Sequence, residues 1–160
     1  MSSQVLRTQA STGLEAWVRL LRAHAWATRT LSADLFAEHG LTINDYEALL
    51  CLSRAEGGRM RRVDLADELL LTASGVTRLL DGLERAGVVE RATCASDRRV
   101  IYAVLTDAGR EKLGEASTSH MAAVRDFFEE RFSEEELVQL AKLLDRLPGT
   151  EGADSADCAA

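Results

Sequence analysis

The stretch "GVTRLLDGLERAGVVERATCASDRRVIYAVLTDAG", Gly75 to Gly109, holds a helical pattern followed at once by two β-type runs. Four apolar residues in its first half recur at the spacing of one helix face: Val76, Leu79, Leu80 and Leu83. This spacing predicts a helix with a single buried stripe, which ends at Gly87. Residues 88–91 and 100–105 have strand-type composition, and a polar segment joins them. We therefore expect a helix followed directly by an antiparallel hairpin.

A shorter helix is expected just upstream of this stretch. The segment "RMRRVDLADELLL", residues 59–71, predicts a helix from about Arg62 to Leu69. Two short helices joined by a brief turn and followed by a hairpin are typical of a winged helix-turn-helix. In that motif the second helix reads the major groove of DNA, and the hairpin, called the wing, lies beside the backbone. The order of elements therefore indicates a DNA-binding lobe.

The second helix of the motif offers side chains suited to DNA. Thr77 and Arg78 fall opposite its apolar stripe, and a hydroxyl and a planar guanidinium can bind phosphates or purine edges. Thr72, Ser74 and Gly75 are small residues at the helix start, where backbone N–H groups can approach a phosphate. The same residues also fit an ordinary helix surface that faces solvent.

The tip of the hairpin carries two adjacent arginines, Arg98 and Arg99, in a chain whose net charge is −7. A wing tip lies where the minor groove makes the potential most negative, and arginine is the side chain suited to enter it. The other interpretation of these residues is a solvated hairpin without a DNA contact, in which Asp97 pairs locally with one arginine.

The net negative charge is concentrated in the last third of the chain. Residues 111–160 hold five Lys and Arg against twelve Asp and Glu, whereas residues 59–110 hold nine arginines against eight carboxylates. Local potential governs phosphate contact more than total charge does. The middle of this acidic chain can therefore still present a basic face.

Long amphipathic helices are expected on both sides of the motif. Residues 14–36 have apolar residues at helical spacing, and this helix should end near Gly40. Thr42 and Asp45 predict the N-cap of the next helix, which closes near Gly57. An amphipathic helix longer than a small winged lobe can cover needs another surface for its apolar side.

Two further helices are expected after the hairpin. Thr106 should cap a long helix, and the Ser133 and Glu136 pair is typical of a capping box that opens a last helix. Pro148 ends the last helix, and the remainder has the composition of a disordered tail.

The expected fold class is mainly α with a small β wing: a winged helix-turn-helix with N- and C-terminal helical dimerisation arms. We expect a single regulator domain over residues 1–148 and a disordered tail over 149–160. Within that domain the DNA-binding lobe spans about 60–106, and the dimerisation helices span about 12–38 and 107–147.

These residues resemble the MarR family of bacterial transcriptional regulators. The most specific part is a wing signature of Asp, any residue and Arg, followed by Leu-Thr and Gly, present as Asp97-Arg98-Arg99 and Leu105-Thr106-Asp107-Ala108-Gly109. The segment "GVTRLLDGLERAGVVER" and the helical arms extend the resemblance over Leu14 to Leu147. One departure is Gly82, where members often carry a larger polar residue, typically arginine, so the DNA or charge contact of that position is in doubt.

The resemblance implies a homodimer that binds a pseudopalindromic operator in double-stranded DNA, acts as a repressor and is released by a small-molecule ligand. By motif position, Thr72, Ser74, Thr77 and Arg78 are the implied contacts of the recognition helix. The implied wing contacts are Arg98 and Arg99, with Asp97 holding the wing.

A small anionic or phenolic ligand is the expected effector. Trp17, His24, Trp26 and Tyr46 are candidates for lining its cleft, with Arg91 or Arg78 as an anion partner. Aromatic residues at helical spacing are also typical of a core or a dimer interface.

Other classes of function find little support in the sequence. No nucleophile motif, P-loop, dinucleotide fingerprint or HExxH occurs, so an enzyme is not expected. Three dispersed histidines and three cysteines without CxxC predict no metal site, and no cofactor is expected. A redox role for Cys94 is left open. A winged protein-interaction module without DNA binding is the alternative.

No run of 18 apolar residues predicts a membrane span, and the first residues lack the apolar segment of a secretory signal. We therefore expect a cytoplasmic protein.

Overall fold

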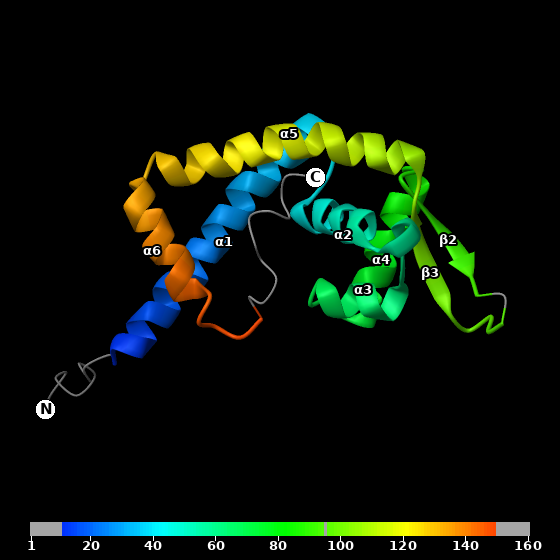
Figure 1. Ribbon diagram of the computed structural model, residues 1–160, viewed down its shortest axis with the longest axis horizontal. Helices are drawn as coiled ribbons and strands as arrows, with labels where there is room; N and C mark the ends of the chain where they lie inside the picture. The colour runs from blue at the N-terminus through cyan, green and yellow to red at the C-terminus, as the bar shows by residue number, and fades with distance from the viewer. Residues whose placement is uncertain (1–10, 95, 150–160) are drawn as a thin grey trace, which may run out of the picture. The chain divides into compact units, whose positions relative to one another are not determined.

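The computed structural model describes residues 11–94 and 96–149 (Figure 1). Its helices and strands confirm the expected fold class, a mainly helical chain with a small antiparallel sheet. In chain order the elements are α1 (Thr12–His39), α2 (Ile43–Arg54), the 3-10 turn η1 (Glu56–Gly58), β1 (Arg59–Arg61), α3 (Arg62–Glu68), α4 (Ala73–Arg85), β2 (Val89–Thr93), β3 (Ile101–Leu105), α5 (Asp107–Glu129) and α6 (Glu134–Leu144).

The chain divides into two compact units, residues 1–120 and 121–160, and the boundary falls inside α5. The first unit contains α1 to α4, the sheet and the start of α5, whereas the second contains the end of α5 and α6. The disordered tail expected over residues 149–160 lies outside the described residues, apart from Gly149.

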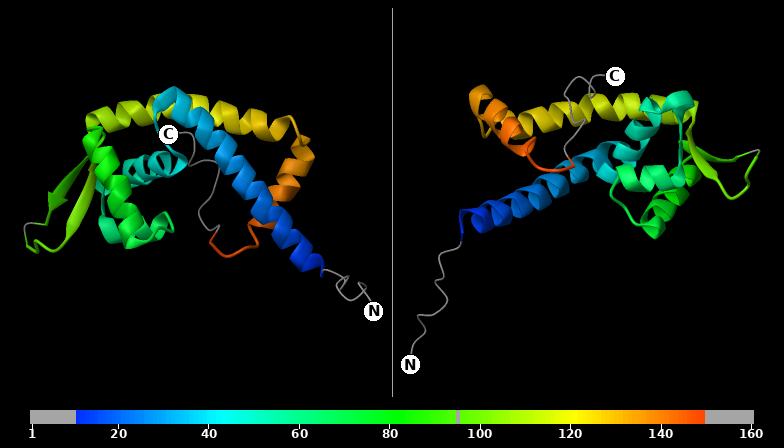
Figure 2. Two further views of the ribbon diagram at one scale, coloured as in Figure 1. Left: turned by 180° about the vertical axis from the view of Figure 1, so that it is seen from behind. Right: turned by 60° about the horizontal axis from the view of Figure 1, so that its bottom comes forward.

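The sheet has three strands in the order β1-β3-β2, all antiparallel. The β2–β3 hairpin has the predicted position, and Figures 1 and 2 show its tip projecting away from α3 and α4. Strand β1 was not expected from the sequence. It is only three residues long and pairs with β3, so that Arg59 lies opposite Val104 and Arg61 opposite Tyr102.

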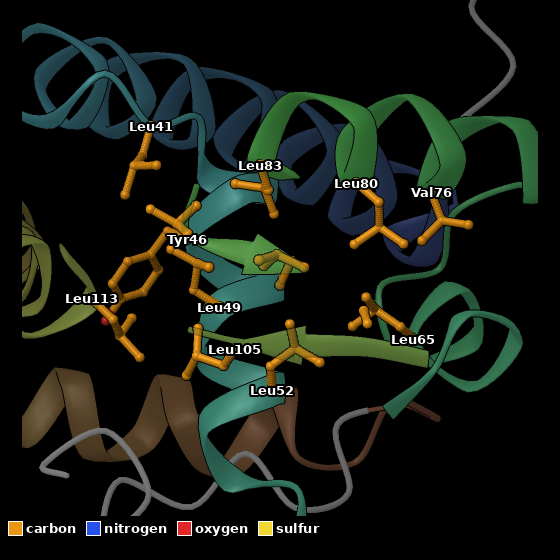
Figure 3. Packing of buried hydrophobic residues seen from close by; sticks show 14 of the residues in the cluster. Leu41, Tyr46, Leu49, Leu52, Leu65, Val76, Leu80, Leu83, Leu105 and Leu113 are labelled. Atoms are coloured by element: carbon orange, nitrogen blue, oxygen red, sulfur yellow. The ribbon is translucent and has the colours of Figure 1, made fainter. Parts of the chain in front are cut away.

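The core of the first unit forms where α2, α3 and α4 meet the sheet. Val76, Leu80 and Leu83 point from α4 into this core, which confirms most of the apolar stripe predicted for that helix (Figure 3). Leu49 and Leu52 of α2 belong to the same core and are fully buried. Packing of this kind fixes α4 through one side only, so the opposite side faces solvent.

Helix ends are set by local chemistry, as the sequence predicted. Gly40 ends α1 in the left-handed region, with φ of 69°. Thr42 with Asp45 and Ser133 with Glu136 form the two expected capping boxes, at the starts of α2 and α6.

Thr106 joins the end of the α4 region to the start of α5. Its hydroxyl donates to the carbonyl of Gly87 at 2.8 Å and accepts from the backbone N–H of Gly109 at 3.0 Å. Its own N–H donates to the carbonyl of Val88 at 3.2 Å. The Leu-Thr-x-x-Gly signature therefore has a structural cause, because threonine ties two segments and glycine allows their close approach.

No helix in the part of the chain that the structure describes combines the length and the apolar character needed to span a membrane.

Candidate nucleic-acid interface

The start of α4 is built from small polar residues, as expected. The Thr72 hydroxyl caps the helix by accepting from the backbone N–H of Gly75 at 3.1 Å, and the Ser74 hydroxyl oxygen lies 3.2 Å from it. Thr72 and Ser74 are exposed. The first turn of α4 contains no acidic residue. An approaching phosphate therefore meets hydroxyl groups and no repelling carboxylate at this end of the helix.

Thr77 and Arg78 lie one turn further along α4. Thr77 is half-buried, and its hydroxyl donates to the carbonyl of Ala73 at 2.8 Å. Arg78 is exposed, and its Nε lies 3.4 Å from the carbonyl oxygen of Ser74. A guanidinium has five N–H donors, and this long contact uses only one of them. The others remain available to donate to a base edge or a phosphate.

The second half of α4 has the opposite charge character. Asp81 and Glu84 both form ion pairs with Arg91 of β2, the second with Nε and Oε2 3.1 Å apart. This arrangement attaches the hairpin to α4 and leaves the arginine neutralised. Arg91 thus has a structural contact that the sequence did not indicate, and its ligand-binding role stays a prediction.

Gly82 lies between these carboxylates in the sequence. Outside the backbone of α4 itself, no atom in the described part of the chain lies within 4 Å of a Cβ built at this position, so the space beside Gly82 could hold a longer side chain. The structure therefore gives no packing reason for the glycine that departs from the family pattern.

Asp97 organises residues 97–100 of the hairpin loop. The Asp97 carboxylate accepts from the backbone N–H of Arg99 at 3.0 Å, and the N–H of Val100 donates to the Asp97 carbonyl at 3.0 Å. This corrects the expected pairing of Asp97 with an arginine side chain, because the contact is an Asx turn. Arg98 and Arg99 are both exposed at the loop.

Cys94 lies at the base of the same loop and is half-buried. Its pKa is lowered, chiefly by the Ser96 hydroxyl, whose oxygen lies 3.1 Å from Sγ, and then by the backbone N–H groups of Ser96 and Asp97.

The expected ligand-lining residues have different surroundings. Trp17 and Trp26 are 58% and 46% exposed on α1, and His24 is exposed there too. Tyr46 is only 6% exposed and belongs to the core. His24 lies near enough to Glu47 to lower the pKa of that carboxyl, although burial raises it by more. The structure does not show these four residues lining one cavity.

Tyr46 has partners on α5 that the sequence did not reveal. Its hydroxyl lies 3.2 Å from the hydroxyl of Ser117, and its ring lies 4.8 Å from the ring of His120. His39 at the end of α1 lies 2.6 Å from the hydroxyl of Ser119. These contacts depend on helix packing, which residue spacing alone does not specify.

Within residues 11–94 and 96–149 no three His, Cys, Asp or Glu side chains gather in a way that could hold a metal ion.

Known proteins with a similar sequence or a similar structure are transcriptional regulators. The family model described as MarR family matches residues 39–100, which extend from the end of α1 to the hairpin loop. The transcriptional repressor YetL of Bacillus subtilis is 32% identical over 109 residues, which are 68% of this chain and 65% of that protein.

Solved structures resemble most of the chain. AbsC, a MarR family transcriptional regulator from Streptomyces coelicolor, is 38% identical with a TM-score of 0.72, over 81% of this chain and 86% of AbsC. Sco3205, a regulator of the same family and organism solved in complex with DNA, is 28% identical with a TM-score of 0.75, over 81% of each chain.

Proposed function

Because this chain belongs to the MarR family of transcriptional regulators, we propose that it is a repressor that binds a pseudopalindromic operator as a homodimer. A small anionic or phenolic ligand releases it from the DNA. The chain acts as a DNA-binding regulator and not as an enzyme, and such a protein works in the cytoplasm, where bacterial DNA is found.

The observation that carries this proposal is the attachment of the hairpin to α4. Arg91 of β2 binds Asp81 and Glu84 of α4, so the exposed Arg78 and the loop arginines belong to one lobe. A helix that reads bases and a wing that binds the backbone must keep a fixed spacing to engage one operator. The regulator Sco3205, which shares the fold, has been solved with DNA.

Exposed apolar side chains support the homodimer. On α1, Leu14, Trp17 and Leu21 are each more than half exposed. In the second unit Leu143 is 59% exposed. Apolar helix faces of this kind normally pack against a partner, and a second copy of the chain gives a closed, two-fold assembly.

The DNA contacts are tested by first selecting bound genomic fragments and footprinting the strongest. We expect a protected inverted repeat with half-sites about 10 base pairs apart, centre to centre.

Arg98→Ala should weaken binding across all sequences, because a wing contact to the backbone or minor groove does not depend on one base. Arg78→Ala should instead relax the preference at particular bases, at a cost of about 1–3 kcal/mol.

Arg125→Ala is the matched control, because Arg125 is an exposed arginine of the second unit that pairs with Asp126. It should leave the affinity unchanged. A folded, dimeric protein that enriches no fragment would contradict the proposal and favour a winged protein-interaction module instead.

The ligand is tested with the tryptophan fluorescence of the protein. Titration with a panel of phenolic and carboxylate compounds, salicylate and urate among them, should quench Trp17 or Trp26 and lower operator affinity together. Trp17→Phe and Trp26→Phe assign the change to one residue. Quenching without any change in operator affinity would show that the compound binds the protein but does not release it from DNA. That result would contradict the proposed release by a ligand.

A further inference from the structure

Helix α4 carries a row of small side chains beside Arg78. Ala73 and Thr77 are four residues apart, so their side chains lie on one strip of the helix surface. Asp81 is the next residue of this row, and it forms an ion pair with Arg91 of β2. The row is therefore uncharged over the first two turns of α4, and the charge beyond them is paired.

The Thr77 hydroxyl, which the sequence offered as a DNA contact, is already used inside the helix. It donates to the carbonyl of Ala73 at 2.8 Å. A hydroxyl has a single proton, so while this bond is kept the group cannot also donate to DNA. Phosphate oxygens and the N7 and O6 atoms of guanine accept hydrogen bonds and do not donate them. The Thr77 hydroxyl is therefore poorly suited to bind either of them.

The methyl group of Thr77 remains for a contact with DNA. The Cβ of threonine carries two heavy atoms, and the hydrogen bond directs the oxygen back toward the preceding turn of the helix. The methyl group takes the other branch. Ala73 adds a second methyl group one turn earlier and is exposed. The row thus offers two methyl groups next to the exposed Arg78.

Methyl groups of this kind recognise one base. Thymine alone among the four DNA bases carries a methyl group in the major groove, at C5, and small side chains such as alanine and threonine read it by apolar contact. We propose that Thr77, together with Ala73, reads a thymine in each operator half-site through its methyl group. This inference rests on the proposed DNA binding and adds to it the identity of one base.

The test removes the thymine methyl group without changing the base pair. Each thymine of the selected operator is replaced in turn by deoxyuridine, at the equivalent position of both half-sites, and fluorescence anisotropy at fixed salt gives the dissociation constant. At one position the wild type should bind roughly fourfold more weakly for each half-site altered, which is the usual effect of one buried methyl group.

Two variants separate the methyl group of Thr77 from its hydroxyl. Thr77→Ser keeps the hydroxyl and removes the methyl group, so it should bind the thymine and uracil duplexes equally. Thr77→Val keeps a methyl group and removes the hydroxyl, so it should still prefer thymine. Ala73→Gly should lose part of the preference.

Thr118→Ser is the matched control. Thr118 lies on α5 and makes the same kind of bond, since its hydroxyl donates to the carbonyl of Gly114 at 3.2 Å. Loss of this methyl group should leave the full preference for thymine.

Three outcomes would overturn the inference while the proposed function stands. The wild type could bind every uracil duplex as tightly as the thymine duplex, or a thymine preference could persist in Thr77→Ser, which would show that another residue reads the methyl group. Loss of operator binding in Thr77→Val but not in Thr77→Ser would identify the hydroxyl as the contact. A folded wild type that selects no operator would instead contradict the proposed function, and this inference would fail with it.

Discussion

Gly109 shows how a single missing side chain determines a junction. It lies in the first turn of α5, where a Cβ would overlap the carbonyl oxygen of Val88 and come within 2.7 Å of Cδ1 of Leu105. This oxygen, in the residue just before β2, also accepts from the backbone N–H of Thr106, so it has little room to move aside. The glycine of the Leu-Thr-x-x-Gly signature is therefore required by close packing of α5 on the start of β2.

We predict that Gly109→Ala lowers the free energy of unfolding by about 1–3 kcal/mol, the usual cost of overpacking. Urea denaturation followed by circular dichroism measures it. Gly114→Ala is the matched control on the same helix, because no neighbouring atom of the described residues lies within 4 Å of the Cβ that alanine would add there. The control should raise stability by up to about 1 kcal/mol, as alanine favours helix over glycine. A Gly109→Ala protein as stable as the wild type would refute the packing argument.

Cys94 has a chemical environment that a neighbouring hydroxyl controls. We predict that Ser96→Ala raises the pKa of the Cys94 thiol, because the hydrogen bond from Ser96 is the largest cause of its lowered value. The rate of alkylation by iodoacetamide at neutral pH should fall, measured site by site with mass spectrometry. Cys51 is the internal reference, since burial raises its pKa. An unchanged rate at Cys94 would contradict the assignment.

The recognition helix α4 has two halves with different chemistry. Its first half carries hydroxyl groups and Arg78, whereas Asp81 and Glu84 in its second half bind Arg91. Carboxylates repel phosphates, so we expect the DNA contacts of α4 to lie in its first two turns. The same two carboxylates connect the helix to the hairpin, which makes the pair of elements a single binding unit.

We predict a coupling between Arg91 and Asp81 in a double-mutant cycle. Arg91→Ala and Asp81→Ala should each destabilise the protein, and the two effects should be less than additive by about 0.5 kcal/mol, as expected for partly exposed ion pairs. The coupling should shrink at 1 M salt, because screening weakens it. Thermal unfolding of the four proteins measures it, and strictly additive effects would show that the ion pair adds nothing.

At the scale of the whole molecule, we expect the contact of α2 with α5 to depend on pH through His120. Burial lowers the pKa of His120 below its ordinary value of 6.5, and its Nδ1 is buried without a hydrogen-bond partner among the described residues. The folded protein therefore binds this proton less readily than the unfolded chain. Stability from the neutral ring is present above the unfolded pKa and is lost as pH falls below about 6.5.

We predict that the urea concentration at the midpoint of unfolding decreases as the pH is lowered from 7.5 to 5.5. The decrease should be smaller in His120→Phe. Phenylalanine keeps the ring beside Tyr46 and has no proton to bind. Equal pH dependence in His120→Phe and in the wild type would exclude this histidine as a cause.

Elements fixed by local chemistry could be predicted from the sequence, and contacts between distant segments could not. Capping boxes and the stripe of α4 depend on residues at most one or two turns apart, so their spacing specified them. Strand β1 has only three residues and exists through pairing with β3, which no local pattern indicates. The partners of Arg91 and Tyr46 come from other elements for the same reason.

The three hydrogen bonds of Thr106 bear on how a signal would travel through the chain. They join the segment after α4 directly to the first turn of α5, with no flexible linker between them. Any rotation of that first turn must carry the base of the hairpin with it or break those bonds. We therefore expect a small rotation of this first turn of α5 to displace the C-terminal end of α4 as well.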